Sequence, residues 1–459
     1  MPGKTNNSTH NLVDGSIQQS LIRMTMPMII GMLMLFTFSL VDTWFISFLG
    51  TEALTAISFT FPVTFFVMSL AIGLGIGASA VVGKFLGASQ HKKAKEAATV
   101  INYISFVLAC ITVTICWTFI DEIFGLMGAS ERLLVPIREY MEVWFAGSIL
   151  MVCIMTGNSV LRACGDTKTP SILMAGAGFI NAVLDPLLIF GIGPFPELGI
   201  QGAAWATVIA WTIGFSYLFY LLIFKVEMVS RSIPSRSVMI ASGGDMLRIG
   251  IPAAGANMMT PLAAGVMTAI AAGFGDTAVA AFGVGARIEP IATLLVLAMS
   301  SSLPPIISQN FGATRIDRVE EAYRLSIKFI LGWQLLVYMV LAIGAGLIAS
   351  FFSDDPEVIS AIRLFVWIMP VGYGLQGIII LTNSSLNALH KPLSALYLSI
   401  ARFFVFYVPL AYAGSVYYGL FGFFAGAVCG NFLMAMISWR TFNRAISGEH
   451  RLRKETVEA

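Results

Sequence analysis

Apolar runs long enough to cross a bilayer recur along the whole chain, and short stretches between them hold most of the charged and turn-forming residues. A membrane-spanning helix needs about 20 predominantly apolar residues. The pattern therefore predicts an all-α integral membrane protein with twelve transmembrane helices, at residues 22–48, 57–83, 98–119, 134–158, 170–192, 200–224, 249–273, 279–308, 328–351, 361–386, 392–414 and 419–440.

Motifs of the first half return in the second half at a nearly constant spacing. The matching pairs are Arg23-x-x-x-Pro27 with Arg248-x-x-x-Pro252, Leu86-Gly-Ala-Ser89 with Phe311-Gly-Ala-Thr314, and Asn158-Ser-x-Leu161 with Asn383-Ser-x-Leu386. Each repeat holds six spans, which is an even number, so both halves enter the membrane the same way round. We expect two six-helix lobes related by a pseudo-two-fold axis along the membrane normal, with the substrate path between them.

Charge sets the expected orientation. Only 11% of the 459 residues are charged and 57% are hydrophobic, whereas about 25% of residues are charged in a soluble domain. Most Lys and Arg lie in the loops that would be cytoplasmic if both termini were inside, as the positive-inside rule requires. The predicted division, in a bacterial cytoplasmic membrane, is an N-terminal tail (1–21), a first lobe (22–224), a cytoplasmic linker (225–248), a second lobe (249–440) and a C-terminal tail (441–459).

One carboxylate lies inside the first predicted span. Asp42 follows Pro27 by about 22 Å along a helix, which is within a hydrocarbon layer about 30 Å thick. Acidic residues at that depth usually face a bundle interior or a wet cavity and mark ion or proton pathways. The structural alternative is a buried acid that is satisfied by a neighbouring hydroxyl.

A second carboxylate lies at the same depth in the fifth span, in Asn181-x-x-x-Asp185-Pro186. Asn181 is one helical turn from Asp185 and on the same face. Asp42, Asp185 and Asn181 can therefore meet, and such a group can share a proton or bind Na⁺ through its oxygens; we favour the proton. The structural alternative is that Asp185-Pro186 marks only a break in the helix, whose polar groups hydrogen-bond to Asn181.

The first span also contains Pro27 and a group of flexible side chains. Pro27 either occupies the first turn of its helix, where a proline breaks nothing, or lies inside the helix and allows it to bend. Met28, Met32, Met34 and Phe38 are candidates for a binding surface that accepts many apolar shapes, or they are ordinary core residues.

The acids are not repeated in the second half. Met267 stands where the repeat would place Asp42, and Tyr407 or Val408 where it would place Asp185. Ion coupling is therefore expected in the first lobe alone. Arg287, Glu289 and Arg402 are the charged residues of spans eight and eleven, and we expect them to pair internally, with gating or substrate contact as the alternative.

Signatures of other chemistries are missing from the sequence. Gly73-x-Gly75-x-Gly77 lies inside a span and predicts close helix packing rather than a dinucleotide loop. The sequence has no P-loop and no paired metal-ligand spacing, and its net charge of +2 is too small to indicate a nucleic-acid partner. We expect a protein that is not an enzyme and has no cofactor or metal.

The chain resembles the multidrug and toxic compound extrusion (MATE) family over nearly its whole length. The motifs that carry the resemblance are Pro27 with Asp42, Arg162-x-x-Gly-Asp166-Thr-Lys168-x-Pro170, Asn181-x-x-x-Asp185-Pro186 and Gly199-x-x-Gly202-Ala-Ala. It is most similar to the prokaryotic branch that includes DNA-damage-inducible protein F. The resemblance implies that Asp42 and Asp185 are protonated, that Tyr140, Asn158 and Asn181 surround them, and that the first helix bends at Pro27.

The expected function is secondary active efflux. The resemblance implies a monomeric antiporter that exports amphipathic organic cations, including drugs, in exchange for protons by alternating access, with membrane lipids around it and no nucleic acid. Alternatives are Na⁺ as the coupling ion, or a flippase for lipids or lipid-linked glycans. A receptor or intramembrane enzyme would need a metal or nucleophile group at membrane depth, and the sequence offers none.

Overall fold

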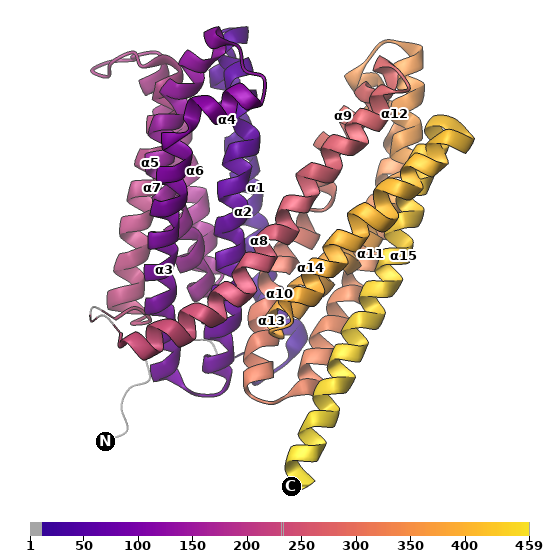
Figure 1. Ribbon diagram of the computed structural model, residues 1–459. Helices are drawn as coiled ribbons and strands as arrows, with labels where there is room; N and C mark the ends of the chain where they lie inside the picture. The colour runs from indigo at the N-terminus through magenta and orange to yellow at the C-terminus, as the bar shows by residue number, and fades with distance from the viewer. Residues whose placement is uncertain (1–11, 231, 233, 459) are drawn as a thin grey trace. The chain divides into compact units, whose positions relative to one another are not determined.

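The computed structural model describes residues 12–230, 232 and 234–458, and within these ranges the chain is helical apart from short connections (Figure 1). The helices of the first half are α1 (Ile17–Ser47), α2 (Thr51–Gly87), α3 (His91–Thr118), α4 (Ile120–Leu126), α5 (Glu131–Ala163), α6 (Lys168–Ile189), α7 (Gly199–Tyr220) and the π-helix η1 (Leu221–Lys225). Those of the second half are α8 (Arg236–Ala272), α9 (Asp276–Ala292), α10 (Leu294–Gly312), α11 (Ile316–Phe352), α12 (Pro356–Ile368), α13 (Val371–Ala388), α14 (Pro392–Ala401), the π-helix η2 (Arg402–Tyr407) and α15 (Val408–Glu458).

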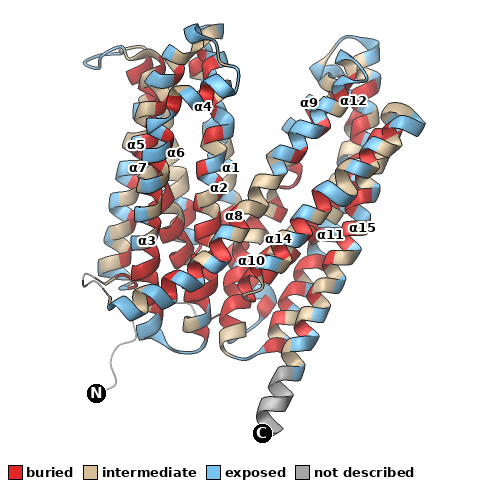
Figure 2. Ribbon diagram, viewed as in Figure 1, coloured by how far each residue is buried: buried red, intermediate tan, exposed pale blue. Residues whose placement is uncertain are grey.

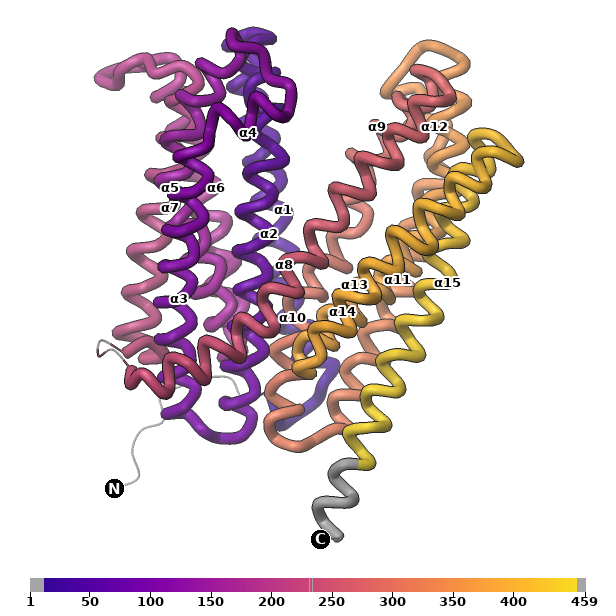
Figure 3. Tube along the Cα trace, viewed as in Figure 1, coloured from indigo at the N-terminus to yellow at the C-terminus, as the bar shows by residue number. Residues whose placement is uncertain are grey.

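The number of spans agrees with the twelve predicted. Within the described residues, nine helices are long and apolar enough to cross a membrane, and two bent pairs, α9 with α10 and α12 with α13, bring the number to eleven. The twelfth comes from α15, whose backbone leaves the helical conformation at Gly419 (φ 60°). Beyond this kink the chain runs back against the preceding span, because added Cβ atoms at Gly422 and Gly426 would meet the backbone of Gly414 and Leu410. The reversal is visible in the trace of α15 (Figure 3).

Contacts divide the chain into two compact units. Unit 1 contains Met26–Ala254, and unit 2 contains Val13–Thr25 and the described residues from Gly255 onward. The start of α1 thus belongs to unit 2, where the Thr25 hydroxyl lies 2.7 Å from that of Ser302. The start of α8 belongs to unit 1. This division differs from the expected lobe boundaries because α1 and α8 each begin in one unit and end in the other.

The backbone repeats as the sequence does. Left-handed conformations occur at matching connections, and the φ values are 99° and 93° at Gly50 and Gly275, 57° and 64° at Ser89 and Thr314, and 84° and 58° at Gly165 and His390. Such values are uncommon for residues other than glycine. Equivalent turns therefore join equivalent helices, as the repeated motifs predict.

Small residues allow the helices of unit 1 to approach closely. A Cβ added at Gly77 would lie 2.6 Å from the carbonyl oxygen of Met246 on α8, and one at Gly75 would lie 2.6 Å from the Ser159 hydroxyl on α5. Most of residues 69–83 on α2 are buried, and buried residues recur along α5. Figure 2 shows buried segments alternating with exposed ones on the helices of this unit. The glycine series of α2 is thus a helix-packing motif, as expected.

Candidate ion-coupling site

Helices α1 and α6 run side by side in the same direction within unit 1. At one end the Ser171 hydroxyl lies 3.7 Å from the sulfur of Met28, and a Cβ added at Gly31 would lie 3.0 Å from Ser171. Further along, the ring of Phe38 fills the space that a side chain at Gly178 would need. Gly31 and Phe38 are seven residues apart on α1, as are their partners Ser171 and Gly178 on α6, so the two helices run side by side toward the predicted acids.

The two predicted carboxyl groups meet near the ends of these helices. Asp42 and Asp185 are close enough for their side chains to hydrogen-bond to each other. Asp185 is completely buried. The buried oxygens Oδ1 of Asp42 and Oδ2 of Asp185 accept no hydrogen bond from any N–H or hydroxyl of the described residues. Two ionised carboxylates repel each other at such a distance, so a shared proton is the simplest way to satisfy the pair.

An amide and a hydroxyl hold Asp185 in place. Asn181 donates from Nδ2 to Oδ1 of Asp185 at 3.2 Å and also to the hydroxyl of Thr207 on α7 at 3.1 Å. The Thr207 hydroxyl in turn donates to the backbone oxygen of Ala203. Sequence reasoning missed Thr207. It reaches Asn181 because α7 packs closely on α6, where a Cβ added at Gly202 would meet the backbone of α6.

Tyr140 joins the group and Asn158 does not. Tyr140 on α5 interacts electrostatically with both Asp42 and Asp185. Asn158 follows it by about 27 Å along the same helix. Asn158 is buried there, and its Oδ1 has no hydrogen-bond partner among the described residues. The structure therefore separates Asn158 from the carboxyl pair, because positions so far apart on one helix cannot reach one site.

The other candidates on α1 fall into different environments. Pro27 lies ten residues inside α1, so it does not occupy the first turn of the helix. Met28 is buried against α6, and Phe38 packs on Gly178 of the same helix. Met34 is 37% exposed, and Met32 is half-buried. Met28 and Phe38 thus take part in helix packing within unit 1.

The charged residues of unit 2 do not pair with one another as expected. Glu289 accepts a hydrogen bond from Nε2 of Gln376 at 2.8 Å, and Arg402 donates from Nε to Oδ1 of Asn431 at 3.1 Å. Arg287 is exposed and belongs to none of the ion pairs among the described residues. The prediction of internal ion pairing is wrong, because Glu289 and the Nε of Arg402 each hydrogen-bond to a neutral amide and no ion pair joins these residues in the described part of the chain. Met267, at the position equivalent to Asp42, is a buried core residue.

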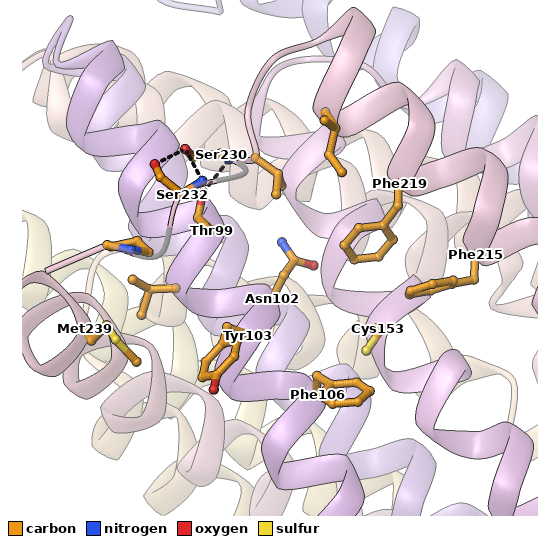
Figure 4. A pocket seen from close by; sticks show the side chains of 14 residues that line it. Thr99, Asn102, Tyr103, Phe106, Cys153, Phe215, Phe219, Ser230, Ser232 and Met239 are labelled. Atoms are coloured by element: carbon orange, nitrogen blue, oxygen red, sulfur yellow. Dashed lines mark hydrogen bonds between the residues drawn. The ribbon is translucent and has the colours of Figure 1, made fainter. Parts of the chain in front are cut away.

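Unit 1 also contains an apolar cavity of about 330 Å³ beside the linker (Figure 4). Aromatic side chains of α3 and α7 line it, among them Tyr103, Phe106, Phe215 and Phe219. The linker is held at its edge, where the amide of Ser230 donates to the Thr99 hydroxyl at 2.9 Å. Neither acid of the pair lines this cavity, so it is separate from the carboxyl pair.

Comparison with known proteins identifies the chain. A family profile described as MatE matches residues 27–187 and 252–413, one segment in each repeat. The chain belongs to the MATE family. It is accordingly an integral membrane transporter with twelve membrane spans and is not an enzyme. Across the described residues, no three His, Cys, Asp or Glu side chains are grouped so that they could hold a metal ion.

The names of individual relatives give different transported substrates. The chain is 42% identical over 427 residues to a protein of Shewanella oneidensis named FAD transporter, covering 93% of this chain and 94% of that one. It is 26% identical to the multidrug export protein MepA of Staphylococcus haemolyticus, covering 89% of each. The bent form of the Vibrio cholerae MATE transporter VcmN matches with a TM-score of 0.90 and 33% identity, covering 94% of this chain and 98% of that one.

Proposed function

We propose that this transporter is a proton-driven antiporter in which Asp42 and Asp185 together hold the coupling proton. The observation that carries the proposal is the contact between two carboxyl groups that each have one buried oxygen without a donor among the described residues, Oδ1 of Asp42 and Oδ2 of Asp185. A proton satisfies such a pair directly, whereas Na⁺ requires several oxygen ligands around it. We therefore favour H⁺ over Na⁺ and propose that transport requires no cofactor.

We propose a flavin dinucleotide as the exported substrate. Support comes from the identity of 42% with the Shewanella protein named FAD transporter, which extends over nearly the whole of both chains. Amphipathic organic cations, which the sequence led us to expect, are the second candidate. Their support is the similarity to MepA, at 26% identity. A flippase activity toward lipids has no comparable support among these relatives.

Reconstitution tests both parts of this proposal. Purified protein in liposomes, given only an imposed pH gradient, is expected to move FAD against its concentration gradient. An equal Na⁺ gradient at constant pH should produce no such movement. Ethidium, assayed in parallel, distinguishes cation export from flavin export. A strict requirement for ATP would contradict the antiporter mechanism, and movement of ethidium without FAD would contradict the flavin assignment.

We also propose that the protein is a monomer in the bacterial cytoplasmic membrane with both termini and the linker on the cytoplasmic side. The distribution of Lys and Arg supports this orientation. Ser235 is exposed in the linker and offers a labelling site. Ser235→Cys should react with an impermeant thiol reagent in inside-out vesicles only. Reaction in intact cells would reverse the orientation.

A further inference from the structure

Unit 2 buries an arginine that the coupling mechanism does not use. Arg402 is 7% exposed and begins the π-helix η2 within the eleventh span. Its Nε donates to Asn431, and its guanidinium lies 4.7 Å from the ring centre of Phe403 and 5.9 Å from that of Tyr407. Within the described residues neither terminal amino group donates a hydrogen bond, and no ion pair includes Arg402. A charged group inside a membrane bundle with free donors usually has a function.

Further polar groups lie around Arg402. Tyr407 interacts electrostatically with both Arg402 and Glu289, and Tyr373 with Glu289 and Tyr407. Tyr373 is 2% exposed, and its hydroxyl has no hydrogen-bond partner in the described structure. A buried hydroxyl without a partner destabilises the folded protein unless a ligand or water satisfies it. The cluster therefore has unused donors on two side chains that are each more than nine-tenths buried.

The local backbone explains why these groups converge. In a π-helix the hydrogen bonds run from residue i to i+5, which widens the turn. Arg402 and Tyr407 are five residues apart at the two ends of η2, so the wider turn brings their side chains onto one face. Helices α9, α13 and α15 supply Glu289, Tyr373 and Asn431. π-helical turns often occur at functional sites.

We propose that Arg402, Tyr407 and Tyr373 form a subsite in unit 2 that binds a phosphate group of the transported substrate. This assignment rests on the proposed export of a flavin dinucleotide, which carries two phosphates. The free donors are a guanidinium fork and a hydroxyl, which match phosphate oxygens, and the positive charge of the guanidinium would repel a cation. Glu289 offsets the charge of Arg402 electrostatically while the subsite is empty. Its carboxylate accepts a hydrogen bond from Gln376 and forms no ion pair with the arginine.

Replacement of the arginine tests the subsite. In proteoliposomes with an imposed pH gradient, Arg402→Gln is expected to lower FAD export about tenfold or more, because a hydrogen bond to a charged group is lost in an apolar site. Ethidium movement should change less than about twofold, since ethidium carries no phosphate. Arg363→Gln, which removes an exposed arginine that stacks on Trp367, is the matched control and should leave both rates unchanged.

A second variant keeps the arginine and its packing. Asn431→Asp places a carboxylate where the Asn431 oxygen already accepts from Arg402, so the protein should fold while the arginine becomes paired. FAD export should fall as in Arg402→Gln, with an unchanged elution profile and melting temperature. If the wild type exports FAD and both variants export it equally well, the subsite is overturned and the flavin function stands. If the wild type exports ethidium but no FAD, the flavin function and the subsite both fail, and the proton mechanism stands.

Discussion

The two units are built on one repeated scaffold, yet they contain different charges at comparable places. Unit 1 brings two carboxyl groups together on α1 and α6. At the corresponding positions unit 2 has Met267 in its apolar core and the η2 segment, where Arg402 is buried. The backbone turns are the same in both, as the matched left-handed residues show. A duplicated fold can thus divide two tasks, and we assign proton coupling to unit 1 and anion recognition to unit 2.

Of the predicted effects, neutralising the acids of unit 1 should lower gradient-driven efflux the most. Asp42→Asn and Asp185→Asn each keep the side-chain shape but cannot exchange a proton, so gradient-driven efflux should fall to the rate of protein-free liposomes. Met267 lies at the position in unit 2 that is equivalent to Asp42, and the variant Met267→Leu should transport at the wild-type rate. Full efflux by both Asn variants would make the carboxyl pair structural and would place coupling elsewhere, with Glu289 the next candidate.

A smaller effect is expected from the hydroxyl that orients Asn181. Thr207→Val removes the group to which Asn181 donates at 3.1 Å, and the amide then holds Asp185 less firmly. Because a neutral hydrogen bond is worth about 0.5–1.5 kcal/mol, the efflux rate should fall about threefold to tenfold. Thr212→Val on the exposed part of the same helix removes only a bond to its own helix backbone and serves as control. Equal efflux rates in the two variants would show that Thr207 does not contribute to the site.

The smallest expected effect concerns the packing that keeps α1 and α6 in register. A Cβ at Gly178 would enter the space of the Phe38 ring, whereas one at Gly176 would meet nothing within 4 Å. Gly178→Ala should therefore lower the unfolding free energy by about 1–2 kcal/mol, seen as a lower melting temperature in detergent. Gly176→Ala should melt at or slightly above the wild-type temperature. The same shift in both variants would show that α1 and α6 do not pack as described.

Much of the architecture could be predicted from the sequence because it depends on patterns within single helices. Span length, the repeated motifs and the depth of Asp42 and Asp185 are all counted along the chain. The meeting of these two acids followed from equal depths on two helices. The position of Asn181 beside Asp185 followed from a spacing of one helical turn. The packing role of the α2 glycines followed from their position inside a span.

The remaining features depend on contacts between helices, which spacing alone does not reveal. Thr207 reaches the site only because α7 packs closely on α6 at Gly202. Asn158 fails to reach it because Tyr140 lies near the other end of α5. The amide partners of Glu289 and Arg402 come from α13 and α15, far away in sequence. The π-helical turn at Arg402 has no sequence signal that we recognised.

Proton release on substrate binding is the most direct measurement of the central assignment. In an antiporter the substrate and the proton compete, so adding FAD to purified protein in weakly buffered detergent should release protons into solution. Ethidium should do the same if cations are the substrate. The account predicts measurable acidification with the wild type and with Met267→Leu, and none with the Asp42→Asn, Asp185→Asn double variant. Equal acidification by the double variant would contradict the assignment of coupling to this pair.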